Sequence, residues 1–325
     1  MSKKIERILV TGACGQIGTE LCFALGEKYG AENVIASDIR PSEEVNIKNI
    51  GAYEFCDVTK YEQIAAIIDQ HKIDTVFHMA AILSAVGEKN PFLCWDVNMN
   101  GTINTLKCAI DKNLTRVIIP SSIAAFGPDT PRDNTPNDTI LRPTSMYGVT
   151  KVCAERLCDY YVKRFGIDVR GLRYPGIISS ETLPGGGTTD YAVEIYYKAV
   201  SEGSYQCFLS ENTMLPMMYM PDCIKATLDL AEAPLEKIEH HSDFNLAAFS
   251  VTPAGITESI KKYIPEFNCT YKPDYRQPIA DSWPNSIDDS IARNEWDWKP
   301  DWDLDSMTRD MLEKLKKRFE EGKLY

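Results

Sequence analysis

Several features that would point to a metal, a membrane or a nucleic acid are missing from this chain of 325 residues. No stretch approaches the ~18 consecutive apolar residues that a membrane-spanning helix needs. The ten cysteines include no Cys-x-x-Cys pair and the four histidines show no ligand spacing, so we expect neither a metal site nor a disulfide framework. Basic residues are outnumbered: 35 Lys and Arg against 47 Asp and Glu give a net charge of −12. Nucleic acids and anionic membranes are polyanions, so we expect neither as a partner.

The segment MSKKIER before the first apolar run is too short for a signal or transit peptide. Several cysteines lie in apolar runs, where they act as small hydrophobic residues and stay reduced. We therefore expect a cytoplasmic protein. An organellar origin stays open only for a chain from which a presequence has been removed.

The first half of the chain alternates short β-branched runs with helical patterns, which is typical of a parallel sheet covered on both faces. Together these elements predict an α/β fold with a doubly wound parallel sheet. The expected strands are 8–10, 33–38, 52–58, 74–81, 116–122 and 168–174, and the expected helices are 16–29, 60–70, 91–112 and 146–165.

The second half is less regular. It contains a glycine-rich stretch at 184–187, helical patterns near 190–202 and 222–232, and the apolar segment 244–247, which could return to the main sheet. The alternating charges of 313–323 are typical of a solvated helix face. We expect a dinucleotide-binding domain of residues 1–175 plus about 222–250, and a smaller substrate-binding lobe of about 176–221 plus 251–325.

A glycine-rich turn joins the first strand to the first helix. Gly12, Gly15 and Gly18 stand in the order G-x-x-G-x-x-G, with Gln16 and Ile17 opening the helix. Glycine is needed where such a turn is tight and where the backbone approaches a pyrophosphate. The helix N-terminus supplies N–H groups and the positive end of the helix dipole. These five residues are therefore predicted to bind a dinucleotide.

Asp38 ends the second strand, 20 residues after Gly18. A carboxylate there accepts hydrogen bonds from the adenosine ribose and repels a 2′-phosphate, which favours NAD. Its alternative is a turn or helix-cap role, and Arg40 leaves room for NADP.

Two further strand ends are predicted to lie beside the cofactor. Asp57 and Val58 are placed for the adenine, although Asp57 or Thr59 could equally cap the next helix. Ala80 and Ala81 end the fourth strand, where small side chains admit a ligand or a packed helix.

Tyr147 and Lys151 form a Tyr-x-x-x-Lys pair, and the i, i+4 spacing puts both on one face of a helix. The ordinary tyrosine pKa near 10 is too high for a base at neutral pH. A nearby ammonium favours the phenolate, so the pair could supply a general base. Ser122 lies at a strand end and faces the expected crevice.

These motifs, together with the Arg-Tyr-Pro-Gly segment that contains Tyr174, resemble the extended short-chain dehydrogenases across about residues 5–180. The resemblance implies that Tyr147 removes the substrate hydroxyl proton, Ser122 orients that oxygen and Lys151 also binds the nicotinamide ribose. It implies that Tyr174 flanks the nicotinamide. Asn98 matches an asparagine that supports the lysine through a helix irregularity, although it could be an ordinary polar helix residue.

The extended family includes nucleotide-sugar epimerases and dehydratases, which usually carry an arginine where this chain reads LPMMYMPD (215–222). The segments AAILSAVGEKNP, PGGGTTDYA and DSWP instead resemble the short-chain L-threonine 3-dehydrogenases. That resemblance implies NAD-dependent, metal-independent oxidation of L-threonine.

Carried over by position, the substrate-binding residues are Ser84, Thr188 and Thr189, beside Ser122 and Tyr147. Each has an alternative: Ser84 could be a loop hydroxyl, and the threonines could cap the helix near 190–202.

Two rival functions are a nucleotide-sugar 4-epimerase or dehydratase and a dinucleotide-sensing regulator without chemistry. The presence of the Tyr147–Lys151 pair argues against a regulator, because such a protein has no need of a general base. Family resemblance also implies a homodimer through the helices near 91–112 and 146–165.

Overall fold

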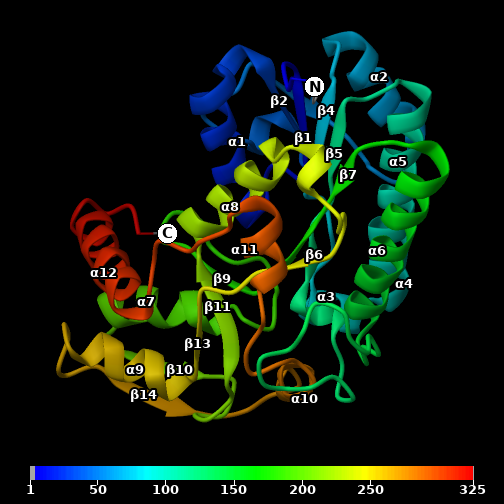
Figure 1. Ribbon diagram of the computed structural model, residues 1–325. Helices are drawn as coiled ribbons and strands as arrows, with labels where there is room; N and C mark the ends of the chain where they lie inside the picture. The colour runs from blue at the N-terminus through cyan, green and yellow to red at the C-terminus, as the bar shows by residue number, and fades with distance from the viewer. Residues whose placement is uncertain (1–3, 325) are drawn as a thin grey trace.

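The computed structural model describes residues 4–324. Its main sheet has six parallel strands in the order β3-β2-β1-β4-β5-β7 (Figure 1). The strands are β1 (Ile8–Thr11), β2 (Val34–Asp38), β3 (Ala52–Phe55), β4 (Thr75–His78), β5 (Arg116–Ile118) and β7 (Val169–Arg170). The order turns back between β1 and β4, which leaves a crevice at the carboxyl ends of the strands. The predicted doubly wound fold is confirmed.

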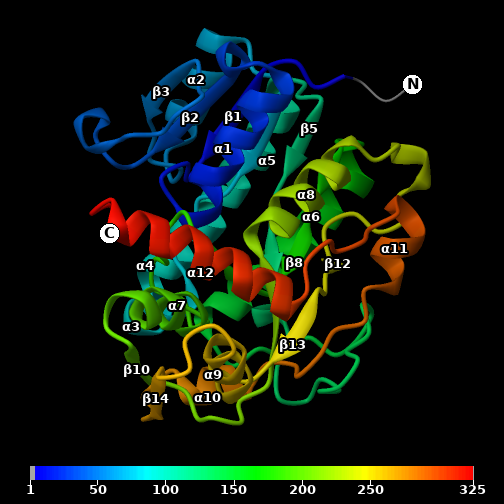
Figure 2. The ribbon, with the colours of Figure 1, turned by 90° about the vertical axis from the view of Figure 1, so that its left-hand side faces the viewer.

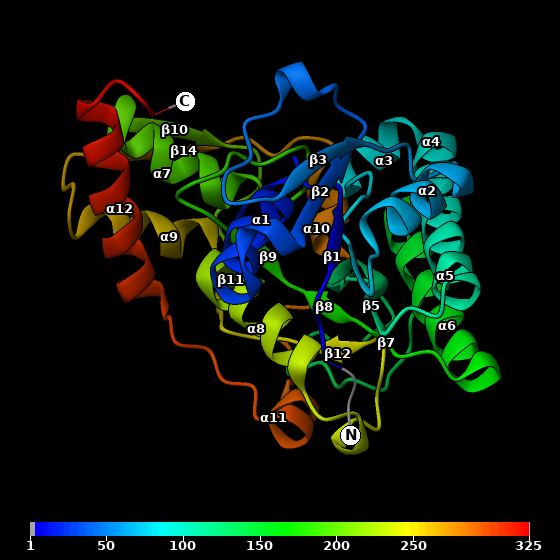
Figure 3. The same ribbon diagram turned by 90° about the horizontal axis from the view of Figure 1, so that it is seen from above.

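Helices cover both faces of this sheet, as Figure 3 shows from above. One face carries α1 (Gln16–Tyr29) and α8 (Met220–Glu232), which contact each other. The other carries α2 (Tyr61–His71), α5 (Gly101–Asp111) and α6 (Met146–Phe165). Because both faces are covered, the central strands are buried and their side chains form two separate apolar cores.

A second small parallel sheet continues from the main one and carries residues of the crevice. It consists of β6 (Ser121–Ser122), β8 (Leu172–Tyr174) and β12 (Phe244–Asn245). The strands expected at 116–122 and 168–174 are each broken in two. Pro120 has no N–H to donate to a ladder, and the N–H of Gly171 donates to the His241 carbonyl oxygen (2.8 Å).

The remaining elements gather at the lower end of the molecule in Figure 1. The strands are β9 (Gly176–Ile178), β10 (Ser204–Cys207), β11 (Leu215–Tyr219), β13 (Phe249–Val251) and β14 (Asn268–Tyr271). The main helices are α7 (Tyr191–Ser201), α9 (Pro253–Lys261) and α12 (Leu304–Glu320). Figure 2 shows α12 crossing this region, where it packs on α7 and α9. It buries Met307, Met311, Leu312 and Leu315, so the charged tail forms one face of an amphipathic helix. The proposed division into two domains stays a prediction.

Short elements complete the chain. They are α3 (Ser84–Lys89), α4 (Pro91–Trp95), a π-helical turn (Asp96–Asn100), α10 (Gln277–Asp281), α11 (Ser290–Trp296) and 3₁₀ turns at Ala31–Asn33, Ser42–Glu44, Ile123–Ala125 and Leu235–Lys237. The helix expected at 91–112 is therefore interrupted by one π-helical turn, and α3 was not predicted.

Within residues 4–324, no helix combines the length and apolarity needed to cross a membrane. The ten cysteines are free thiols. Across the same residues, no three His, Cys, Asp or Glu side chains gather as a metal site.

Candidate active site

A cleft of about 580 Å³ lies at the carboxyl ends of the main strands and extends to the loop before α7. Every candidate residue from the sequence except Asn98 lines it. The residues brought together are Gly12, Gly15, Gln16, Ile17, Gly18, Asp38, Asp57, Val58, Ala80, Ala81, Ser84, Ser122, Tyr147, Lys151, Tyr174, Thr188 and Thr189.

The glycine turn leaves room only for backbone. Gly12 has φ +67°, and a Cβ there would lie 2.5 Å from the Ala80 nitrogen. A Cβ on Gly18 would overlap the Gly12 carbonyl oxygen. Helix α1 begins at Gln16 with no side-chain cap and no acidic residue in its first turn. Its first N–H groups therefore point at the cleft without a protein acceptor, so the turn fits a dinucleotide pyrophosphate.

Asp38 lies at the end of β2 and faces the same part of the cleft. One carboxylate oxygen accepts a hydrogen bond from the Cys14 N–H (3.0 Å) and the other from the Arg40 N–H (3.3 Å). Asp57 accepts from the N–H and hydroxyl of Thr59 at 3.0 and 2.8 Å. The alternative that Asp57 or Thr59 caps the next helix is wrong, because the N-cap of α2 is Lys60 and no side-chain cap hydrogen bond is formed.

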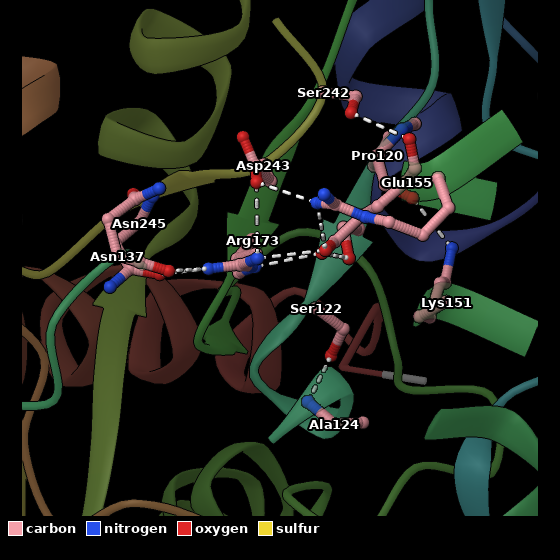
Figure 4. Close-up of polar contacts among 12 residues, drawn as sticks. Pro120, Ser122, Ala124, Asn137, Lys151, Glu155, Arg173, Ser242, Asp243 and Asn245 are labelled. Carbon is pink, nitrogen blue, oxygen red and sulfur yellow. Dashed lines mark hydrogen bonds and ion pairs between the residues drawn. The ribbon is translucent and has the colours of Figure 1, made fainter. Parts of the chain in front are cut away.

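The catalytic candidates come from two elements. Tyr147 and Lys151 lie on the first turns of α6, whose N-cap Ser145 accepts a hydrogen bond from the Gly148 N–H (3.1 Å). Ser122 ends β6, and its Oγ accepts from the Ala124 N–H (3.2 Å). Figure 4 shows the Lys151 ammonium donating to the Pro120 carbonyl oxygen (2.7 Å). The ammonium lies 5.4 Å from the centre of the Tyr147 ring.

Burial governs the proton equilibria of this pair. It raises the pKa of Tyr147 to about 12, against an opposing hydrogen bond with Ser122. It lowers the pKa of Lys151 to about 8. Each group is pushed toward its neutral form because the cleft desolvates both charges. A phenolate at Tyr147 therefore depends on positive charge close by, which the Lys151 ammonium supplies below about pH 8.

Asn98 lies behind the cleft, within the π-helical turn. Its side-chain oxygen accepts from the Ile82 N–H (2.8 Å), and its amide donates to the Ile82 carbonyl (3.1 Å) and the Thr150 hydroxyl (3.1 Å). The expected helix irregularity is present at this residue. Asn98 thus joins the loop after β4 to the residue before Lys151.

At the other end of the cleft two buried hydroxyls meet. Ser84 at the start of α3 and Thr188 lie 2.9 Å apart, and the Thr188 N–H donates to Ser84 Oγ (3.2 Å). Neither Thr188 nor Thr189 caps α7, because the N-cap is Asp190 and no side-chain cap hydrogen bond is formed. Trp283 lines this end too.

Sequence reasoning missed Asp190. Its carboxylate accepts hydrogen bonds from the N–H groups of Gly186 and Gly187 at 2.9 and 2.8 Å, and burial raises its pKa to about 6. The sequence signal that could have identified Asp190 is an acidic residue between a glycine-rich loop and a helix. The loop is also tied to α1, where Glu20 accepts from Ser179 (2.5 Å) and Thr182 (2.8 Å).

His78, at the end of β4, is buried and also reaches the cleft. Its Nδ1 lies 2.8 Å from the Thr11 hydroxyl, its Nε2 has no partner, and burial lowers its pKa to about 3. Tyr174 presents only its ring, because its hydroxyl is hydrogen-bonded to Thr227.

Comparison with known proteins agrees with this geometry. Solved structures similar to this chain include an L-threonine dehydrogenase from Clostridium difficile, which is 50% identical with a TM-score of 0.94 over 97% of this chain and 99% of that one. Another is an L-threonine dehydrogenase from Phytophthora infestans, 52% identical with a TM-score of 0.92 over 96% and 100%.

Curated relatives include an uncharacterised epimerase/dehydratase of Staphylococcus saprophyticus, 49% identical over 96% of this chain and 97% of the relative. Residues 8–247 match the model of the NAD dependent epimerase/dehydratase family. This match covers most of the chain, including the glycine turn, Ser122, Tyr147 and Lys151. The chain therefore belongs to the NAD dependent epimerase/dehydratase family, whose enzymes use a nicotinamide cofactor.

Proposed function

We propose that the protein oxidises the 3-hydroxyl group of L-threonine to L-2-amino-3-oxobutanoate, with NAD as the oxidant. One observation carries the proposal: the Ser122, Tyr147 and Lys151 group shares a cleft with the Ser84–Thr188 hydroxyl pair. The similar structures of L-threonine dehydrogenases support it. The assignment of each site residue below is likewise our proposal.

The residues present fit a dinucleotide. Gly12, Gly15 and the first turn of α1 (Gln16, Ile17, Gly18) would hold the pyrophosphate. Asp38 would accept hydrogen bonds from the adenosine ribose and so select NAD over NADP. The adenine would lie against Asp57 and Val58, and the nicotinamide half against Ala80, Ala81, Lys151 and Tyr174.

When bound, the nicotinamide ring accepts the hydride that leaves C3 of the substrate. Ser122 donates a hydrogen bond to the substrate oxygen, and Tyr147 takes the hydroxyl proton as general base. The Lys151 ammonium, 5.4 Å from the centre of the Tyr147 ring, would stabilise the phenolate that accepts this proton. Ser84, Thr188 and Thr189 would bind the carboxylate and ammonium groups of L-threonine. The Tyr147 phenolate accepts the proton and the Ser122 hydroxyl stabilises the reacting oxygen, so the proposed chemistry needs no metal.

The alternative is a nucleotide-sugar 4-epimerase or dehydratase, which the family as a whole includes. Such a substrate carries a diphosphate whose charge needs arginine or lysine partners. Among the described residues that line the cleft, the one arginine is Arg40, beside Asp38 at the adenosine end, and the one lysine is Lys151, beside Tyr147. This charge distribution favours a small zwitterion at the other end.

The deciding experiment follows NADH absorbance with purified protein, NAD and L-threonine, with L-serine, L-allo-threonine and UDP-galactose in parallel. We expect NADH to accumulate with L-threonine. An epimerase regenerates its cofactor and releases none. No signal with any amino acid would overturn the substrate assignment and favour the nucleotide-sugar alternative.

Two further proposals concern the whole protein. The cofactor-binding part comprises residues 1–175 and about 222–250, and the substrate-binding part about 176–221 and 251–325. The active species is a homodimer formed through α4, α5 and α6. A cytoplasmic location stays a prediction from the sequence.

A further inference from the structure

A buried carboxylate lies one helical turn after Lys151 on α6. Glu155 is 1% exposed, and both of its oxygens hold the Arg173 guanidinium, Oε1 at 2.8 Å from Nε and Oε2 at 2.8 Å from Nη2. Oε1 also accepts a hydrogen bond from the Ser121 hydroxyl (2.5 Å). Figure 4 shows Glu155 and Arg173 facing each other between the ribbons. One carboxylate thus joins α6, β6 and β8.

The guanidinium of Arg173 is fixed on its other sides as well. Its Nη1 donates to the Asn137 carbonyl oxygen (2.7 Å) and to Asn245 Oδ1 (3.2 Å), and its Nη2 reaches the Asp243 carboxylate at 3.4 Å. A planar fork held at both ends tolerates little movement of its partners. Buried ion pairs add little stability compared with apolar packing of the same volume. The contribution of the Glu155–Arg173 pair is therefore to fix the relative positions of α6, β6 and β8.

The register of β6 and β8 connects this network to the reacting groups. Ser121 pairs with Arg173, and Ser122 pairs with Tyr174. Successive side chains of a strand point to opposite sides, so the Ser121 hydroxyl turns to Glu155, although both Ser121 and Ser122 line the cleft. Lys151 holds the preceding carbonyl, that of Pro120, at 2.7 Å. The strand that carries Ser122 is therefore fastened to α6 at two consecutive residues.

We propose that Glu155 is a positioning residue that, through Ser121 and Arg173, holds Ser122 of β6 at reacting distance from Tyr147 of α6. The inference rests on the roles of Ser122 and Tyr147 in the proposed function. A misplacement of about 1 Å between reacting groups costs on the order of a hundredfold in rate. The network acts on that distance, and it touches neither the substrate end of the cleft nor the glycine turn.

The sharpest variant is Ser121→Ala, which removes one hydroxyl and leaves the Glu155–Arg173 pair intact. We expect kcat to fall by about 10- to 100-fold, with the KM for L-threonine and the affinity for NAD each within about twofold of the wild type. Ser121→Thr keeps the hydroxyl and should restore most of the rate. An unchanged kcat in Ser121→Ala would overturn the proposal.

Ser242→Ala is the matched control. The Ser242 hydroxyl is equally buried and donates to the Glu155 carbonyl oxygen (3.0 Å) and to Asp159 (2.8 Å), but it does not touch β6. Both variants should lose a similar amount of thermal stability, whereas only Ser121→Ala should lose kcat. An equal loss of kcat in both variants would show a general structural effect and contradict the assignment.

A crystal structure of Ser121→Ala supplies a readout that is independent of the substrate. We expect the Ser122 Oγ to Tyr147 Oη distance to change by more than it does in Ser242→Ala. No change in that distance would overturn the positioning role. If the wild type fails to oxidise L-threonine, the proposed function falls alone, and this distance still decides whether Glu155 positions Ser122.

Discussion

The hydroxyl group of Tyr147 is the proton acceptor in the proposed reaction, and it lies in a pocket that raises its pKa to about 12. Tyr147→Phe keeps the ring and removes only the oxygen. We expect kcat to fall by about 10²- to 10⁴-fold, the range of general base catalysis, while NAD affinity measured by fluorescence titration stays unchanged. Tyr160→Phe, on the same helix but 54% exposed, is the control and should keep full activity. Loss of NAD binding in Tyr147→Phe would contradict the assigned role.

Asp38 is the residue that should decide between the two nicotinamide cofactors. Hydrogen bonds to a charged group are worth about 1.5–3 kcal/mol, and Asp38→Asn removes the charge while keeping an acceptor. The expected result is a drop of about tenfold in kcat/KM for NAD together with a gain for NADP, because the repulsion of a 2′-phosphate is relieved. An unchanged ratio of the two kcat/KM values would place the ribose elsewhere.

At this scale the sequence predicted well which candidate side chains share the cleft, and predicted their hydrogen-bond partners poorly. Ser122, Tyr147 and Lys151 could be placed because a strand end and a helix start fix where such side chains face. The hydrogen bond between the Tyr174 hydroxyl and Thr227 and the unpartnered Nε2 of His78 depend on packing between segments far apart in the chain. No local pattern encodes those contacts.

The loop before α7 is held by an acid that should titrate within the physiological range. Asp190 accepts two N–H groups of the glycine-rich loop, and burial raises its pKa to about 6. Hydrogen bonds to an ionised acceptor are roughly twice as strong as neutral ones, so protonation loosens the loop that carries Thr188. We expect the KM for L-threonine to rise as the pH falls below about 6. In Asp190→Asn it should be raised and independent of pH between 5 and 8.

The raised pKa of Asp190 also makes folding stability depend on pH. Here a fall in pH has the opposite effect to that on substrate binding, because it favours the folded state. The folded-state pKa lies above the ordinary 3.8, so between about pH 4 and 6 the folded chain holds a proton that the unfolded chain has lost. Ionisation of Asp190 therefore costs stability as the pH rises through this window. Asp190→Asn should be at least as stable as the wild type at pH 7, as thermal unfolding would report. A less stable variant with a normal KM would refute the assignment of Asp190 as a loop anchor.

Among the elements, the helices with readable ends were predicted best. The bounds expected for α1 and α6 coincide with those observed, and α6 has Ser145 as N-cap and Gly166 in the left-handed conformation after its last turn. Two strands were predicted too long, because Pro120 and Gly171 divide them, whereas β1 extends one residue beyond its expected end. The π-helical turn around Asn98 arises from contacts with Ile82 and Thr150, which the spacing of apolar residues does not reveal.

On the scale of the whole molecule, large apolar side chains are exposed on α4 and α6. Phe92 is 89% exposed, Trp95 44% and Phe165 44%, and α4 packs against α6. Large exposed apolar side chains of this kind mark interaction surfaces. Light scattering should therefore report a homodimer. Phe92→Asp should give a monomer, whereas Phe319→Asp, on the distant helix α12, should not. A wild-type monomer at working concentration would refute the dimer.

The overall architecture followed from the alternation of strands and helices, since a parallel sheet covered on both faces has few available topologies. The arrangement of the second half did not, because its elements are short and pair with partners far away in sequence. Strand β10, for example, pairs with β14, more than sixty residues later. Helix α12 was expected as a solvated face, and its buried stripe became evident only from its packing on α7 and α9.

Tyr147, Lys151 and Glu155 lie on consecutive turns of α6. Their relative positions therefore depend on the exact number of residues between them. Each residue of an α-helix advances 1.5 Å and turns by about 100°. Deleting a single residue between Tyr147 and Glu155 would swing one group away from β6 while the others stayed in place. Substitutions on the outer face of α6 leave this alignment untouched. Within these nine residues a change of length should therefore disturb the site more than a substitution on the exposed face of the helix, and the spacing of the three groups matters as much as their identity.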